Sequence, residues 1–94
     1  MDHRAFFLDL ISRFLSRELD RSSVAGRVAR ELPLDSVRGG QKDLLPNCEW
    51  ALRHINDPDF FTTEAELRYY LQCLGGERIY DSDERDQAIR ENVA

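Results

Sequence analysis

Apolar residues recur every three or four positions in four stretches of this 94-residue chain, and this spacing constrains the fold more than any other feature. The stretches cover residues 2–16, 22–32, 44–56 and 63–74, and in each one the apolar side chains fall on one stripe of a helix. No alternation with a period of two extends beyond a few residues. The sequence therefore predicts an all-α fold, in which a single domain, 1–94, forms a compact antiparallel bundle of four helices.

Capping residues and glycines set the ends of these helices. Asp20 and Ser22 are alternative N-caps for the second helix, since both side chains can accept a hydrogen bond from an unpaired amide of the first turn. Gly39 and Gly40 predict a turn, and Asp43 is then a candidate N-cap for the third helix.

The fourth helix has the clearest start and end. The residues from Thr63 to Glu66 form a capping box, in which the Thr63 hydroxyl accepts from the amide three residues on and Glu66 reaches back to the first amide. Gly75, the first of two glycines, is expected to adopt the left-handed conformation that often follows a helix.

The chain after residue 76 leaves two alternatives open. Ile79 and Tyr80 are the last core candidates. The tail from Asp81 to Ala94 either forms a fifth, C-terminal helix or is frayed. If it forms a helix, the side chains directed toward the core would be those of Ala88, Ile89 and Val93.

No arrangement of residues points to metal or cofactor chemistry. The pairs Asp57/Asp59 and Asp81/Asp83 lack the glycine and glutamate that complete a calcium loop, and the two histidines are in no zinc-ligand spacing. Neither glycine pair is followed by the lysine and hydroxyl residue of a phosphate loop. We therefore expect no bound metal and no cofactor.

Catalysis, nucleic-acid binding and membrane insertion are also disfavoured. Cys48 and His54 lie six residues apart on one predicted helix and face different ways, so they form no nucleophile–base pair. A pI of about 4.9 is far below that of a nucleic-acid-binding domain, and no apolar run approaches the roughly 20 residues of a membrane span. We expect a non-enzymatic, cytoplasmic protein in which Cys48 and Cys73 are reduced core thiols; a disulfide between them would require their two helices to pack side by side.

Charge is distributed unevenly along the chain. Residues 1–47 carry seven acidic and eight basic side chains, whereas residues 48–94 carry eleven acidic and five basic ones, so the net charge of −5 arises in the second half. Such a surface repels nucleic acid and attracts basic proteins at long range. Acidic faces also simply keep small proteins in solution, and both interpretations are open.

A candidate contact surface lies where the acidic half begins. Residues 57–66 combine four carboxylates with Phe60 and Phe61, and aromatic anchors with charged rims are typical of protein interfaces. The two phenylalanines could instead staple the fourth helix to the core, and we expect one inside and one partly outside. Trp50 is off the centre of its stripe and either closes the core edge or is partly exposed. The predicted partner-binding residues are Trp50, Asp57, Asp59, Phe60, Phe61, Glu64, Glu66, Asp81, Asp83, Glu84 and Asp86.

About half of the chain resembles the small helical immunity proteins of bacterial toxin systems, including the MafI-like and colicin-D-immunity-like groups. The resemblance is carried by Leu45-Pro46-Asn47-Cys48-Glu49-Trp50-Ala51-Leu52, by a short acidic loop, and by a helix that Thr63 opens, with leucines at positions 67, 71 and 74. Cys48 stands where that family usually has glycine. The resemblance implies a protein that binds the nuclease domain of a secreted toxin and blocks its basic active site.

A second hypothesis is a helical adaptor or regulatory module. Such a module would form a homodimer, or dock on a larger enzyme, through the apolar edge near Trp50, Phe60 and Phe61. A mimic of nucleic acid is disfavoured, because it would need a denser array of carboxylates than a net charge of −5 provides.

Overall fold

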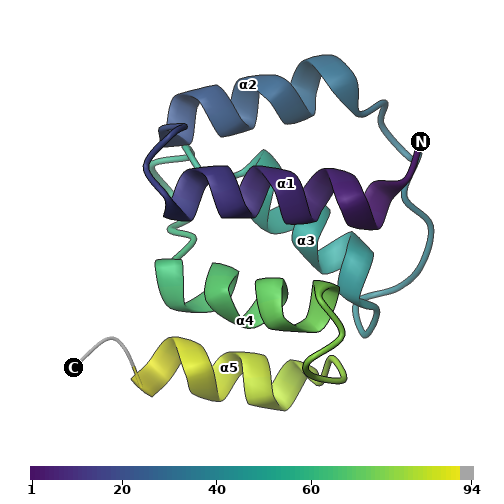
Figure 1. Cartoon of the computed structure of the whole chain (residues 1–94), viewed down its shortest axis with the longest axis vertical. Coiled ribbons are helices and arrows are strands. Elements are labelled where there is room, and N and C mark those ends of the chain that lie inside the picture. Colours follow the sequence, from purple (N-terminus) through teal and green to yellow (C-terminus); the bar gives the residue numbers. More distant parts are fainter. Residues whose placement is uncertain (92–94) are drawn as a thin grey trace.

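The computed structural model describes residues 1–91, which form five helices and no strand (Figure 1). The helices are α1 (His3–Leu15), α2 (Arg21–Glu31), α3 (Leu44–Arg53), α4 (Glu64–Leu74) and α5 (Ser82–Glu91). The predicted all-α fold is confirmed, and of the two alternatives for the tail the helix is the one that forms. Figure 1 shows α1 and α2 running in opposite directions, as do α4 and α5, with α3 inclined behind them. The expected inward position of Val93 lies outside the described residues.

Side-chain caps fix the starts of α2 and α4. The Asp20 carboxylate accepts a hydrogen bond from the Ser23 amide at 2.8 Å, so Asp20 rather than Ser22 is the N-cap of α2. At the start of α4 the Thr63 hydroxyl accepts from the Glu66 amide at 3.1 Å, as the capping box predicts. Each bond satisfies one of the amides that a helix leaves unpaired at its first turn.

The loop before α3 departs from the predicted cap. Asp43 occupies the N-cap position, but its side chain makes no bond to the helix and instead accepts from the Gly40 amide at 2.8 Å. Gly39 has a φ of 130°, and a Cβ at this position would come within 2.7 Å of the Asp43 carboxylate and 3.0 Å of the Pro46 ring. Glycine is therefore required here by both conformation and space.

Two details predicted for α4 are wrong. The Glu66 side chain does not complete the capping box, because it turns inward and accepts a hydrogen bond from the Tyr70 hydroxyl at 2.6 Å. The left-handed glycine is Gly76, with a φ of 84°, whereas Gly75 has a φ of −80° and keeps the right-handed turn. The left-handed residue that follows the helix therefore lies one position later than predicted.

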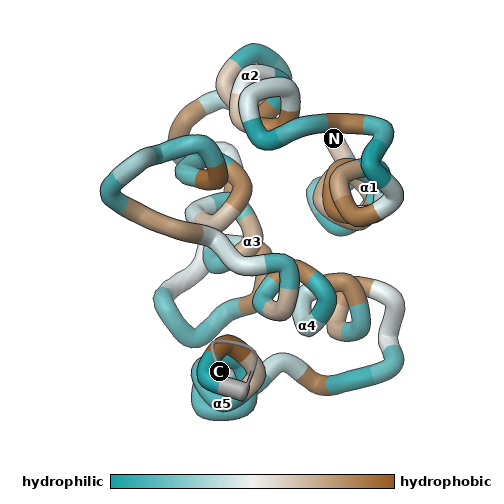
Figure 2. Tube along the Cα trace, turned by 90° about the vertical axis from the view of Figure 1, so that its left-hand side faces the viewer, coloured by the Kyte–Doolittle hydropathy of each residue, from teal (hydrophilic) through white to brown (hydrophobic). Residues whose placement is uncertain are grey.

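The core lies between α1, α2, α3 and α4. Its buried side chains are Phe7, Leu10, Ile11, Phe14, Val24, Val28, Leu32, Cys48, Ala51, Leu52, Ile55, Leu67, Tyr69, Tyr70, Cys73 and Leu74. Both cysteines are free and buried, which confirms the prediction of core thiols. In Figure 2, α5 lies beneath α4 and is largely hydrophilic. It reaches the core only at its edge, through the partly buried Ala88.

The predicted core residue Ile79 is on the surface, where its side chain is 91% exposed. The next residue, Tyr80, is partly buried against the core and accepts a hydrogen bond from Arg85. The loop between α4 and α5 thus turns one of two neighbouring apolar side chains inward and the other outward. Among residues 1–91, no helix has both the length and the apolar character that crossing a membrane requires.

Candidate functional site

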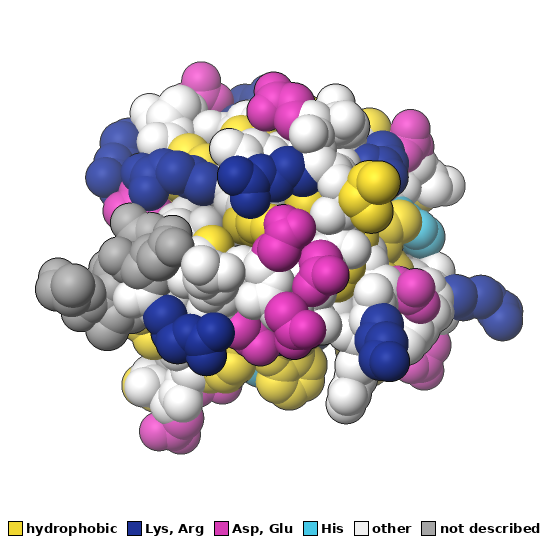
Figure 3. All heavy atoms as spheres, turned by 90° about the horizontal axis from the view of Figure 1, so that it is seen from below, with side chains coloured by type: hydrophobic (Ala, Val, Ile, Leu, Met, Phe, Trp, Pro, Cys, Tyr) yellow, Lys and Arg dark blue, Asp and Glu magenta, His cyan; other side chains and the backbone are white. Residues whose placement is uncertain are grey.

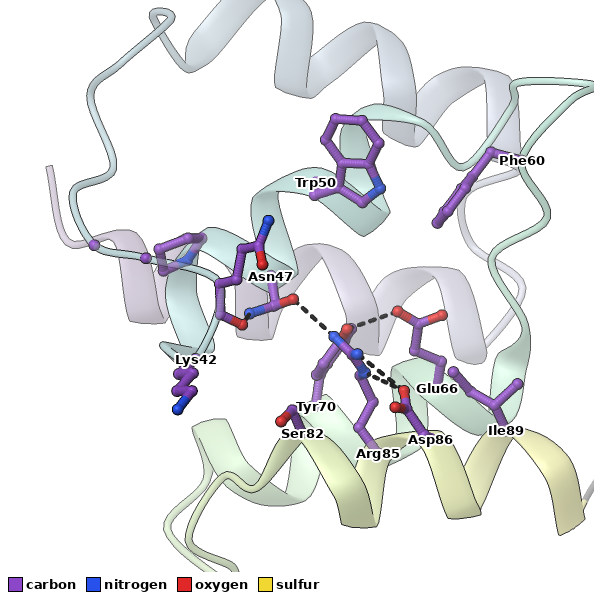
Figure 4. A pocket seen from close by; sticks show the side chains of 14 residues that line it. Lys42, Asn47, Trp50, Phe60, Glu66, Tyr70, Ser82, Arg85, Asp86 and Ile89 are labelled. Carbon is purple, nitrogen blue, oxygen red and sulfur yellow. Dashed lines mark hydrogen bonds and ion pairs between the residues drawn. The ribbon is translucent and has the colours of Figure 1, made fainter.

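A groove of about 810 Å³ runs between the loop before α3, α3 itself, α4 and α5 (Figure 4). It is lined by Gly39, Gly40, Gln41, Lys42, Pro46, Asn47, Trp50, Phe60, Glu66, Tyr70, Ser82, Arg85, Asp86 and Ile89. Its volume is within the range of ligand-binding clefts. We call this surface the α3–α5 groove.

Aromatic side chains form one rim of the α3–α5 groove. Trp50 is 54% exposed, and its ring centroid lies 3.9 Å from that of His54, the C-cap residue of α3. Phe60, from the loop before α4, meets the Trp50 ring edge-on at 5.9 Å and is half-buried. Of the two arrangements open for Trp50, partial exposure is therefore the one observed. The cluster presents an apolar ridge that is held in place by its own ring contacts.

A buried carboxyl group lies in the floor of the groove. Glu66 is only 7% exposed, and its Oε2 accepts the 2.6 Å hydrogen bond from Tyr70, which is 1% exposed and one turn further along α4. Burial raises the pKa of Glu66, and the Tyr70 hydrogen bond and the positive charge of Arg85 offset this rise only in part. Burial likewise raises the pKa of the Tyr70 hydroxyl, so that hydroxyl stays a donor.

Arg85 fixes the α5 side of the groove. Its guanidinium donates to Asn47 Oδ1 on α3 at 2.7 Å and to Asp86 Oδ1 at 2.9 Å (Figure 4). It also donates to the Tyr80 hydroxyl at 3.1 Å. The positive charge is thus paired with the neighbouring carboxylate, while the bond to Asn47 ties α5 to α3. The groove therefore has a hydrogen-bonded floor beside its apolar rim.

The structure brings four of the predicted partner-binding residues to this groove. Trp50, Phe60, Glu66 and Asp86 all line it. Asp57 and Asp59 are exposed on the turn that precedes Phe60, where the Asp57 carboxylate accepts from the Asp59 amide at 2.9 Å. That hydrogen bond shapes the turn and leaves the Asp59 carboxylate on the surface.

Two predicted residues lie away from the groove. Phe61 is 73% exposed and packs on the Arg21 guanidinium, 4.6 Å from its ring centroid, rather than on Trp50. Glu64 pairs with Arg17 at 3.4 Å beside a smaller pocket that Arg21 also lines. Neither phenylalanine enters the core, so the expectation of one inside is wrong, and the two rings belong to separate surfaces.

The remaining predicted residues surround the start of α5. Asp81 Oδ1 accepts from the amides of Asp83 and Glu84 at 2.8 and 3.3 Å, which makes Asp81 a cap for this helix. Asp83 and Glu84 are exposed and do not line the groove. Figure 3, the view from below α5, shows acidic side chains near the centre of this face with basic ones around them.

Several groove residues were not among the sequence predictions. Tyr70 was missed, although it lies four residues after the predicted Glu66 on a predicted helix, a spacing that signals a side-chain pair. Ser82, Arg85 and Ile89 recur at three- and four-residue steps and form one stripe of α5. The contact between Arg85 and Asn47 joins residues 38 positions apart and has no signal in the sequence.

No group of three or more His, Cys, Asp and Glu side chains suited to a metal ion occurs between residues 1 and 91. Comparison with protein families, with curated proteins and with solved structures finds no match for this chain.

Proposed function

We propose that this chain is an immunity-type protein, which binds and neutralises a bacterial toxin domain through the face that carries the α3–α5 groove. The observation that carries the proposal is the cluster of Trp50, His54 and Phe60 at the groove rim, with Trp50 half-exposed. Tryptophan is one of the residue types enriched among those that contribute most binding energy in protein interfaces. The resemblance of residues 45–74 to immunity proteins suggests the class of partner.

The charge of the chain suggests the chemistry of that partner. The excess of acidic side chains lies in the second half, which supplies α4, α5 and most of the groove. A nuclease domain carries basic groups to hold the phosphate backbone of its substrate. Opposite charges steer the two proteins together and speed their association, more than they add to final affinity. We therefore propose a basic toxin domain, of the nuclease class, as the partner.

The two free, buried cysteines support a reducing compartment as the place of action. We propose that the protein acts in the bacterial cytoplasm, where an inhibitor would meet a toxin before secretion.

Co-production with the toxin encoded by a neighbouring gene tests the proposal. The expected result is a stable complex on size exclusion, together with loss of the toxin's nuclease activity in proportion to added inhibitor. The absence of any complex, with full nuclease activity at excess inhibitor, would overturn the assignment. Raising the salt concentration should slow association, because surface charge is screened over roughly 8–10 Å at physiological ionic strength.

The exposed rim also favours a second candidate function, a helical adaptor that pairs with another copy of itself or docks on a larger enzyme. Trp50 would then be buried between two copies or against the enzyme. Light scattering of the purified chain separates the candidates in part. A tight dimer whose tryptophan emission shifts to shorter wavelength on association favours the adaptor, and a monomer at all concentrations argues against self-pairing.

A further inference from the structure

One carboxylate oxygen of Glu66 has no hydrogen-bond donor among residues 1–91. The Tyr70 hydroxyl occupies Oε2, and Figure 4 shows the other oxygen pointing into the α3–α5 groove on the side of Phe60 and Ile89. Solvent in the groove reaches this oxygen, but only 7% of the residue is exposed, so the partial loss of hydration of its charge carries an unfavourable free energy. A donor that entered from the groove would relieve it.

The surroundings of this oxygen select the kind of donor. In Figure 4 Phe60 lies on one side of the oxygen, with Trp50 beyond Phe60 in the same aromatic rim, and Ile89 of α5 lies on the other side. An aromatic wall beside a carboxylate is the environment that a cationic side chain prefers, because the ring face attracts positive charge while the carboxylate accepts its protons. A neutral amide would gain only the hydrogen bond.

The two basic residues that line the groove leave this position open. Arg85 is already engaged by Asp86, Asn47 and Tyr80. Lys42 is exposed and lies at the opposite end of the groove from Glu66 in Figure 4.

We propose that the Glu66 end of the α3–α5 groove receives an arginine side chain of the protein partner. The planar guanidinium donates to the open oxygen of Glu66 and stacks against the rings of Trp50 and Phe60. Arginine fits better than lysine, because its flat, weakly hydrated head group can stack and donate at once. The inference rests on the proposed function for the source of the arginine, whereas the preference of the groove is a property of this chain alone.

Short peptides measure that preference without the partner. The probe is acetyl-Gly-Arg-Gly-amide, compared with the same peptide carrying citrulline, which keeps the shape of arginine and removes its charge. Trp50 is the only tryptophan of the chain and lines the groove, so its fluorescence reports occupancy directly. The citrulline peptide is expected to bind about tenfold more weakly than the arginine peptide, because a hydrogen bond between charged groups is replaced by a neutral one.

A variant pair assigns the preference to Glu66. Glu66→Gln removes the charge and keeps an oxygen that can accept from Tyr70, whereas Glu84→Gln makes the same chemical change at an exposed residue outside the groove. Glu66→Gln should raise the Kd of the arginine peptide about tenfold. Glu84→Gln should leave it within about twofold, as expected for a screened surface charge.

Three results would overturn the inference: equal binding of the two peptides, no saturable fluorescence change at millimolar arginine peptide, or equal affinity for the wild-type chain and Glu66→Gln. The comparison of the two peptides uses the wild-type chain, so it stands even when the variant folds poorly. A toxin complex that Glu66→Gln leaves unchanged would refute the arginine site and keep the proposed function. Selective binding of the arginine peptide without any toxin complex would refute the function and keep the site.

Discussion

Replacing Tyr70 by phenylalanine removes one hydroxyl group from the floor of the groove and tests the buried pair on which the site is built. The hydroxyl donates to Glu66 at 2.6 Å, and the two side chains are 1% and 7% exposed. Hydrogen bonds to a charged partner contribute about 1.5–3 kcal/mol, and the phenylalanine ring keeps the packing. Tyr70→Phe should therefore lower the free energy of unfolding by about 2 kcal/mol at pH 7.

Urea unfolding followed by circular dichroism measures this loss, and its pH dependence identifies the partner. The loss should shrink toward about 1 kcal/mol as the pH is lowered and Glu66 takes up a proton, because the bond then joins neutral groups. A double-mutant cycle with Glu66→Gln should give a coupling energy that is clearly different from zero. A loss below about 0.5 kcal/mol, or strictly additive effects, would refute the reasoning, since values in that range are typical of surface positions.

Three further changes follow from the structure. Glu66→Gln should gain stability relative to the wild-type chain as the pH rises through the raised pKa of Glu66, because a carboxyl whose pKa is higher in the folded state makes the wild-type protein less stable as it ionises. Urea unfolding of both proteins between pH 4 and 8 measures this, and a difference in stability that stays constant with pH would contradict it. Gly76→Ala should lower the free energy of unfolding by about 1 kcal/mol, because Gly76 has a φ of 84°, whereas Gly75→Ala, at a φ of −80°, should change it by less than about 0.5 kcal/mol. Thermal unfolding measures both, and equal effects would contradict the assignment of the left-handed conformation to Gly76. Arg21→Met should cost about 2 kcal/mol, because it removes the hydrogen bonds to the carbonyl oxygens of Ile55 and Thr62 at 3.0 and 2.9 Å; an unchanged melting temperature would show that these bonds add nothing.

Much of the fold could be predicted from local signals. Helical spacing identified the first four helices, and the side chains of Asp20 and Thr63 start α2 and α4 because a helix leaves its first amides unpaired. The errors occurred where the decisive contact is not local. The spacing does not show which of two glycines takes the left-handed conformation, or that Ile79 would be exposed while Tyr80 packs on the core.

The candidate site could be predicted only in part. The position of Trp50 off the apolar stripe left two alternatives open, the core edge and partial exposure, and the structure shows an exposed ring beside Phe60. The separation of Phe60 from Phe61 arises because adjacent residues in a non-helical segment point to different sides, which depends on how the loop is anchored. In this structure Arg21 anchors the loop by donating to the carbonyl oxygens of Ile55 and Thr62, which lie 34 and 41 residues further along the chain. Such distant contacts depend on the packing of α2 against the loop, which the sequence pattern does not encode.

Trp50 lies on the groove rim and Phe61 lies away from the groove, and this difference provides the most direct test of the central claim, that the groove face is the surface that binds the partner. The measurement is the affinity of the neighbouring toxin domain for Trp50→Ala and for Phe61→Ala, both exposed aromatic residues, one on the groove rim and one against Arg21. The account predicts that Trp50→Ala raises the Kd about 30-fold or more, as for a central interface residue, and that Phe61→Ala changes it by less than about threefold. A large loss with Phe61→Ala and none with Trp50→Ala would contradict it.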